Sequence, residues 1–234
     1  MPVQQKQNIK GFTLLELLVI VAIISILAGM GFPEFKKWNR DRLIRVQAEK
    51  ITNLFTTATT QVERGAYPYV RVEFVSGTSP SQIIVKGIAQ DLLSKKINGP
   101  TDPSCSVADF TNTSAYQVDE ITSHTLDDKT YIPALAPKAG QTSVGSGGAI
   151  CFSKGGKYFK QFGSADLQGN IAFDNNSSAA TNNYVTVCHL SSSKCDAVSK
   201  SFDDDYPAYL VRYSRFGMIT KYKWNIKNSD WSSQ

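Results

Sequence analysis

The sequence holds little histidine, little excess charge and only one long apolar run. Two of its 234 residues are His, and 25 Lys and Arg against 20 Asp and Glu give a formal net charge of +5. This charge falls short of the strong basic charge of a dedicated nucleic-acid-binding protein. With 41% hydrophobic and 19% charged residues, the composition also excludes a disordered tail and a polytopic membrane protein.

The motifs of common enzyme classes are missing. Neither His124 nor His189 lies in an H-E-x-x-H sequence or beside a nucleophile motif, and no G-x-S-x-G occurs. Gly156 and Lys157 do not end a Walker A loop, because Cys151 stands where that loop needs a glycine. We therefore expect no enzyme activity and no cofactor.

Cysteine is scarce, and its placement favours disulfides. The four cysteines lie in the C-terminal 130 residues and form no C-x-x-C pair, which argues against a redox motif or a zinc knuckle. Two disulfides outside the cytoplasm are the better interpretation. We expect Cys188 to pair with Cys195 and Cys105 with Cys151, although four cysteines allow three pairings.

Three groups of residues are weaker alternatives as metal sites. His189 with Cys188 and Cys195 offers three ligands, but an oxidising compartment favours a disulfide there. Residues 203–205, three aspartates, or Asp174 with Asn175 and Asn176, carry oxygen ligands suited to calcium. Neither group has the glycine and distal glutamate of an EF-hand, so we expect solvated acidic loops and no metal.

The apolar run covers residues 12–32 and follows a polar start whose only charges are Lys6 and Lys10. Its 21 residues just span a bilayer core at 1.5 Å per residue. Glu16 lies inside the run, at a cost of roughly 2.5 to 3.5 kcal/mol on insertion scales. A carboxylate at that cost indicates a function.

A helical pattern continues directly after the apolar run. Apolar residues recur at steps of three and four, and Gly65 and Pro68 close the segment. We expect one helix from about residue 12 to residue 64, kinked at Pro33, whose ring removes a backbone hydrogen bond. The residues of the pattern are Ile44, Ala48, Ile51, Phe55, Ala58 and Val62.

Lys10-Gly11-Phe12-Thr13-Leu14-Leu15-Glu16, followed by an apolar helix, resembles the class III signal of type IV pilins and type II secretion pseudopilins. The resemblance covers residues 6 to about 50. It implies that a prepilin peptidase of the inner membrane cuts between Gly11 and Phe12 and methylates the new amine of Phe12. It also implies that Glu16 acts in assembly and that the apolar helix packs into the core of a helical filament with other pilin subunits.

The same resemblance implies a domain plan and a location. Residues 1–11 are a cleaved leader, 12–33 a transmembrane and filament-core helix, 34–65 its amphipathic half, and 66–234 a globular β-rich head. The precursor lies in the inner membrane of a bacterium with its head in the periplasm, and the processed subunit becomes part of an extracellular pilus.

The head is predicted as mostly β-structure. Residues 70–74 alternate as a half-buried strand does, and residues 208–213 with 218–226 form a closing hairpin. We expect an α+β fold: a long N-terminal helix, its apolar half membrane-spanning, packed on a C-terminal antiparallel β-sheet head that disulfides stabilise. The other expected segments are short strands at 82–86 and 184–189, a short helix at 88–96, a long surface insertion at 101–148 and a hairpin of 149–153 with 157–162.

A second resemblance concerns the subclass. Val185-Thr186-Val187-Cys188, then Cys195 and a hairpin with Gly217 near its turn, is similar to the H-type minor pilins and pseudopilins, although residues 203–205 stand where a tryptophan-rich strand is commoner. The predicted function is therefore a minor pilin of a type IV pilus that primes or caps the filament, with adhesion or DNA uptake as an accessory role. The alternatives are an H-type pseudopilin of a type II secretion system and a DNA-binding competence pilin.

One basic stretch favours the DNA alternative. From residue 206 to residue 229 there is no acid, and five cations alternate with aromatic residues. In the last predicted strand the three lysines share one face, which suits a phosphate backbone. An exposed edge strand protected by lysine has the same pattern. The five candidate DNA contacts are Arg212, Arg215, Lys221, Lys223 and Lys227.

Overall fold

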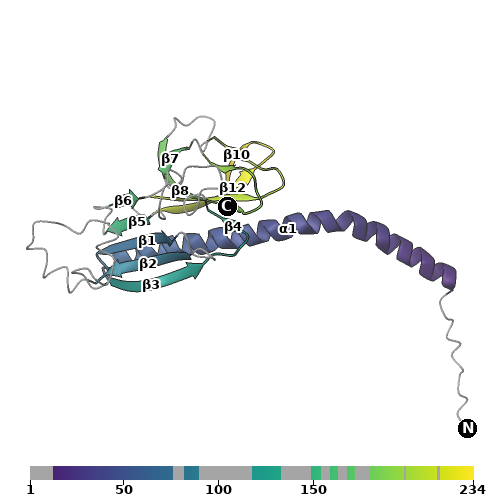
Figure 1. Cartoon of the computed structure of the whole chain (residues 1–234), viewed down its shortest axis with the longest axis horizontal. Helices are drawn as coiled ribbons and strands as arrows, with labels where there is room; N and C mark the ends of the chain where they lie inside the picture. Colours follow the sequence, from purple (N-terminus) through teal and green to yellow (C-terminus); the bar gives the residue numbers. More distant parts are fainter. Residues whose placement is uncertain are drawn as a thin grey trace, which may run out of the picture. The chain divides into compact units, whose positions relative to one another are not determined.

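A computed structural model describes residues 13–75, 82–89, 118–132, 149–153, 159–162, 168–171, 180–197, 199–214 and 217–234. The chain divides into two compact units, Met1–Asn39 and Arg40–Gln234. One helix and antiparallel sheets make up the described residues (Figure 1). The predicted α+β class is thereby confirmed.

Helix α1 runs from Leu14 to Glu63, close to the predicted bounds. It ends where the sequence indicated, because Gly65 adopts a left-handed φ of 75° that a glycine takes without a steric penalty. The amide of Gly65 donates to the Val62 carbonyl at 3.0 Å and that of Ala66 to the Gln61 carbonyl at 3.1 Å. These bonds satisfy carbonyls that the last turn would otherwise leave open.

A five-stranded antiparallel sheet has the order β3-β2-β1-β5-β6. The predicted strand at 70–74 is the middle of β1, and the predicted hairpin at 149–162 is the β5–β6 pair. The strand bounds are β1 Tyr69–Val75, β2 Gln82–Ile88, β3 Val118–Thr125, β5 Ala149–Ser153 and β6 Phe159–Phe162.

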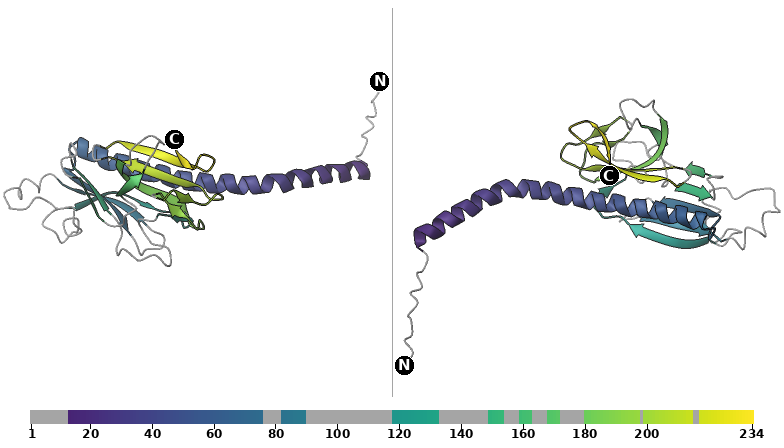
Figure 2. Two further views of the ribbon diagram at one scale, coloured as in Figure 1. Left: turned by 90° about the horizontal axis from the view of Figure 1, so that it is seen from above. Right: turned by 180° about the vertical axis from the view of Figure 1, so that it is seen from behind.

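A second sheet has the order β13-β12-β11-β8-β4, and β7 also pairs with β8. Strands of both sheets run alongside the C-terminal half of α1 (Figure 2). A separate two-stranded ribbon joins β9 (Cys195–Asp196) and β10 (Ser201–Phe202). The bounds in the second sheet are β4 Thr130–Tyr131, β7 Gln168–Ile171, β8 Ala180–His189, β11 Ala208–Tyr213, β12 Ile219–Asn225 and β13 Asp230–Ser233.

Three expectations for the head need correction. The predicted surface insertion contains β3 and β4, and its residues Leu126 and Ile132 are buried in the core. The predicted hairpin at 208–226 does not close the sheet, because β13 follows and pairs with β12. Ile88 belongs to β2 and does not begin a helix; the predicted helix from residue 90 onward lies outside the described residues.

The reason for the first error is local. Strand β3 is an edge strand of its sheet among the described residues, most of its side chains are polar, and none is fully buried. Such a strand shows no strong apolar alternation, so only its pairing with β2 identifies it.

The main hydrophobic core lies between both sheets and the part of α1 that belongs to the second unit. All six apolar residues of the predicted helix pattern are at most 1% exposed. The Phe55 ring lies 4.9 Å from that of Tyr213 on β11, 6.3 Å from Phe152 on β5 and 6.4 Å from Phe74 on β1. A second cluster on the other side of β11 and β12 contains Phe202, Trp224 and Trp231.

Candidate functional site

The predicted cleavage and methylation residues, Gly11 and Phe12, lie outside the described residues, and the first described residue, Thr13, caps α1. Its hydroxyl accepts a hydrogen bond from the amide of Glu16 at 3.2 Å, and its carbonyl accepts one from the amide of Leu17 at 3.2 Å. Thr13 and Glu16 have the spacing of a capping box. The cap fixes Glu16 in the first turn of the helix, where the helix dipole favours a negative charge.

The large apolar side chains from Leu14 to Leu27 are exposed. Leu14 is 83% exposed, and the least exposed large apolar side chain between residues 14 and 27, Ile20, is still 45% exposed. An apolar surface of this kind is stable in water only when another molecule or a lipid phase covers it. The exposed set is Leu14, Leu15, Leu17, Leu18, Val19, Ile20, Val21, Ile23, Ile24, Ile26 and Leu27.

Within the described residues no single helix has both the length and the hydropathy needed to cross a membrane. The segments Leu14–Gly29 and Glu34–Glu63 have them only together, as a bent pair. The kink predicted at Pro33 stays a prediction.

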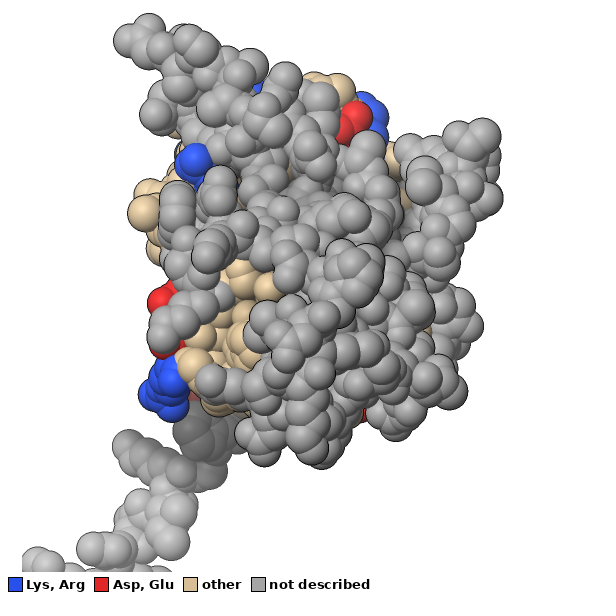
Figure 3. Space-filling view, turned by 90° about the vertical axis from the view of Figure 1, so that its left-hand side faces the viewer, with Lys and Arg blue, Asp and Glu red and all other residues tan. Residues whose placement is uncertain are grey.

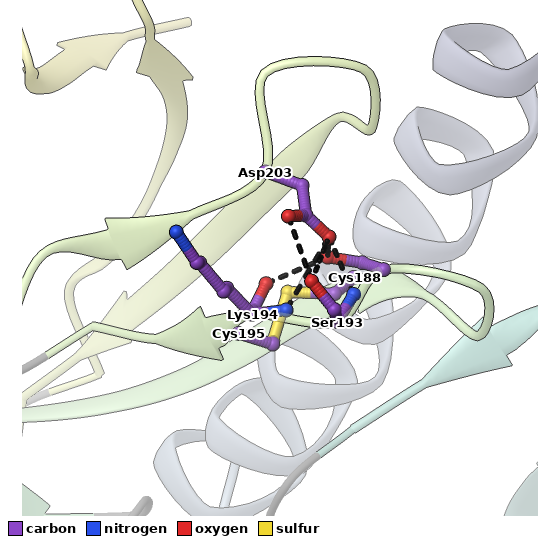
Figure 4. Close-up of a disulfide and its surroundings, with 6 residues drawn as sticks. Cys188, Ser193, Lys194, Cys195 and Asp203 are labelled. Atoms are coloured by element: carbon purple, nitrogen blue, oxygen red, sulfur yellow. Dashed lines mark hydrogen bonds between the residues drawn. A yellow bond between two sulfur atoms is a disulfide. The ribbon is translucent and has the colours of Figure 1, made fainter.

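The disulfide between Cys188 and Cys195 is confirmed (Figure 4). Their Cα atoms are 6.3 Å apart, a separation that a disulfide accommodates. Because the two sulfur atoms are bonded to each other, they are not available as metal ligands. The alternative metal site with His189 is therefore wrong. Cys151 is disulfide-bonded as well, and its predicted partner, Cys105, lies outside the described residues.

Asp203 holds the loop that this disulfide closes. Its carboxylate accepts hydrogen bonds from the Ser192 hydroxyl at 2.9 Å, from the amide and hydroxyl of Ser193, and from the Lys194 amide at 3.3 Å (Figure 4). Although burial acts in the opposite direction, these hydrogen bonds lower the pKa of Asp203. The residue is therefore a loop anchor, a role that the sequence did not indicate.

The surroundings of Asp203 do not support a calcium site. Among the described residues, no group of three or more His, Cys, Asp or Glu side chains is placed to hold a metal ion. The other calcium candidate, Asp174 with Asn175 and Asn176, lies outside the described part of the chain.

His189 belongs to a stacked cluster that the sequence did not indicate. The His189 ring stacks on the Tyr206 ring, with 5.1 Å between the ring centres. The Arg40 guanidinium lies 4.8 Å from the centre of the Tyr206 ring. The Ser191 amide donates to Nδ1 of His189 at 3.1 Å, which requires that nitrogen to be unprotonated. Burial lowers the pKa of His189, and the nearby charges of Arg40 and Lys129 lower it further.

Two of the predicted DNA-contacting lysines face α1. The Lys221 ammonium lies 2.9 Å from the Glu49 carboxylate, and that of Lys223 lies 2.7 Å from Asp41. Tyr209 also donates its hydroxyl to Asp41 at 3.1 Å. The sequence correctly placed both lysines on one face, but it missed the helix carboxylates as their partners. We call Asp41, Glu49, Lys221 and Lys223 the helix–strand ladder.

The ladder has clear electrostatic effects. Hydrogen bonds from Lys221 and Arg45 lower the pKa of Glu49. Burial raises the pKa of Tyr209, and the charge of Asp41 raises it further. The alternative of a lysine-protected edge strand is wrong, because β13 covers β12. An open groove of about 410 Å³ beside the ladder is lined by residues that include Thr52, Thr220 and Gln234.

Of the other three candidate DNA contacts, only Arg212 and Lys227 are among the described residues. Arg212 is half-buried in β11 and Lys227 is exposed in the turn after β12. Arg215 lies outside the described residues. In the view of Figure 3, blue basic side chains at the upper right and lower left lie beside red acidic ones.

Comparison with known proteins gives one match. Residues 6–32 match the family model of the prokaryotic N-terminal methylation motif. The matched segment includes Gly11, Phe12 and Glu16. No curated protein and no solved structure matches the chain.

Proposed function

We propose, from the type IV pilin and pseudopilin signature at residues 6–32, that this protein is a minor pilin of a type IV pilus. The signature indicates a structural subunit rather than an enzyme. It implies processing by a prepilin peptidase, an inner-membrane precursor that becomes associated with a pilus, and assembly with other pilins.

The observation that carries the proposal is the exposed apolar surface of α1 from Leu14 to Leu27. A membrane covers this surface before assembly, and the helices of neighbouring subunits cover it in a filament. Both environments remove the same apolar area from water, so transfer between them needs no refolding of the helix.

Glu16 favours transfer of the helix from the membrane into the filament. After cleavage, the amine of Phe12 is a cation one helical turn from Glu16, and each charge is costly to bury alone. Pairing with the amine of a neighbouring subunit makes burial favourable only once the filament forms. The alternative is a pair within one chain, which would give no axial register.

The head is proposed to lie in the periplasm and later outside the cell, where disulfides persist. Its assignment to a minor rather than a major subunit rests on the H-type resemblance around Cys188 and Cys195. An H-type pseudopilin of a type II secretion system shares the same helix and differs in its partners.

Contact with DNA stays a prediction from the sequence. Lys221 and Lys223 would have to leave Glu49 and Asp41 to reach a phosphate, which raises the cost of such binding. We therefore give the filament role precedence over a DNA-binding competence role.

The test is a deletion of the gene in its own host, complemented by the intact protein. A minor pilin is required for normal piliation, and it is recovered in sheared pili at a small ratio to the major subunit. Loss of hydrolase secretion with normal pili would instead assign the chain to type II secretion. Normal pili and normal secretion would contradict both.

A further inference from the structure

The helix segment that follows the apolar run carries exposed aromatic rings. Phe32, Phe35 and Trp38 are 60%, 61% and 56% exposed, and the exposed side chains of Lys36 and Lys37 lie between them in the sequence. We call these five residues the aromatic–lysine belt. It lies wholly within the first unit of the chain.

Two pairs of belt residues contact each other along the helix. The Lys36 ammonium lies 4.5 Å from the centre of the Phe32 ring, and the rings of Phe35 and Trp38 are 5.9 Å apart. The spacings of four and three residues place each pair on a shared helix face. One ring–ammonium contact and one pair of rings therefore lie within about two turns of helix.

This combination suits the interface between a bilayer and water. Aromatic rings prefer the carbonyl layer of lipids, while lysine ammonium groups extend to the phosphates. The two lysines against Glu34 leave residues 32–38 with a net charge of +1, which complements anionic headgroups. A water-exposed surface has no need for three large exposed aromatic residues within two turns.

Distance along the helix supports the same placement. Trp38 follows Glu16 by 22 residues, which at 1.5 Å per residue corresponds to a path of about 33 Å along the helix, including the bend between Gly29 and Glu34. The hydrocarbon core of a bilayer is about 30 Å thick. A belt held at one surface therefore brings Glu16 to the headgroups of the opposite surface.

We propose that the aromatic–lysine belt binds the phosphate and carbonyl layer of the outer leaflet and so sets the depth of the precursor in the inner membrane. The proposal rests on the pilin function argued above. It explains how Glu16 avoids burial in hydrocarbon before assembly. The carboxylate stays at the cytoplasmic surface of the inner membrane until the subunit leaves the bilayer for the filament.

Tryptophan fluorescence tests the proposal with the full chain in vesicles of phosphatidylcholine and phosphatidylglycerol. The chain has three tryptophans, and Trp224 and Trp231 are buried in the head at 8% and 6% exposure. Lipids that carry bromine near the headgroup should quench Trp38 at least roughly twofold more than lipids brominated near the chain ends.

Two variants provide the controls. Trp38→Phe should abolish quenching by either lipid, because the head tryptophans stay out of the bilayer. Trp38→Phe with Leu27→Trp moves the probe to the midpoint between Glu16 and Trp38, and the deep bromines should then quench more strongly.

Lys36→Gln with Lys37→Gln should reduce the shallow preference of Trp38, whereas Lys227→Gln in the head should not change it. Stronger quenching of Trp38 by deep bromines would overturn the belt proposal alone. So would the absence of any quenching of Trp38 in protein that the vesicles retain. Failure of the chain to be retained by vesicles would overturn the proposed pilin function as well.

Discussion

At the scale of single residues, Glu16 combines the highest insertion cost with the clearest expected role. In Glu16→Gln the side chain keeps its length and loses its charge, so it can no longer pair with the amine of Phe12. We expect normal cleavage after Gly11 and normal membrane location, because the junction and the apolar run are intact. The variant should enter filaments poorly, as measured by its ratio to the major subunit in sheared pili.

Glu34→Gln is the matched control for this prediction, since Glu34 is an exposed acid further along the same helix. It should assemble normally. Recovery of Glu16→Gln in sheared pili at the normal ratio would remove any assembly role for Glu16.

The two histidines make the stability of the head depend on pH. Burial lowers the pKa of both His124 and His189, and nearby Lys50 and Arg40 act in the same direction. A histidine whose folded pKa is depressed binds a proton more readily in the unfolded chain. The free energy of unfolding should therefore fall as the pH drops below the unfolded value of about 6.5.

Urea unfolding of the full chain in detergent, followed by Trp224 and Trp231 fluorescence, measures this effect. The midpoint should be lower at about pH 5.5 than at about pH 7.5. His124→Gln with His189→Gln should flatten the dependence over this range. An equally steep dependence in the double variant would assign the effect to other groups.

At the scale of elements, the helix–strand ladder attaches β12 to α1 through charges. Lys221→Gln with Lys223→Gln leaves Glu49 and Asp41 without their ammonium partners. Because these ion pairs are partly exposed, we expect the unfolding free energy to fall by about 1 kcal/mol in total. Urea unfolding measures the change, and Lys227→Gln, an exposed lysine just beyond β12, is the control without effect.

The same variants separate the ladder from the DNA hypothesis. If the lysines serve DNA instead, the double variant should keep its stability and lose affinity for DNA, with a flatter dependence on salt. No DNA binding by the intact chain at low salt would end that hypothesis.

The loop of β8 and β9 depends on its covalent bond. Cys195 lies seven positions after Cys188 in the sequence, and closure of so short a loop contributes roughly 2.5 kcal/mol on a chain-entropy estimate. Cys188→Ala with Cys195→Ala should lower the unfolding free energy by about that amount under oxidising conditions. A loss well under 1 kcal/mol would mean that the hydrogen bonds of Asp203 hold the loop without the disulfide.

At the scale of the whole molecule, processing should depend on the leader junction and not on the head. A bulky residue in Gly11→Leu should block the peptidase and leave an uncut precursor in the membrane. Mass spectrometry of the normal protein should find a methylated Phe12 at its N-terminus. A mature start near Gly29 or Gly31 would show that an ordinary signal peptidase had acted.

The sequence could predict elements whose signal is local. The helix bounds, the six buried apolar residues from Ile44 to Val62, and the end at Gly65 follow from helical periodicity and from one residue with a special backbone conformation. Strand β3 could not be found in this way, because an edge strand with polar side chains carries no periodic signal of its own.

What the sequence alone determined is the N-terminal signature, the apolar surface of the helix and the carboxylate in its first turn, because each depends on residues at most a few turns apart. What only the tertiary structure decided is which charges meet. Lys221 lies 172 residues from Glu49, and Tyr209 lies 168 from Asp41, so no local pattern relates them. The packing of β12 against α1 gives two lysines of the predicted binding face ion-pair partners on the helix.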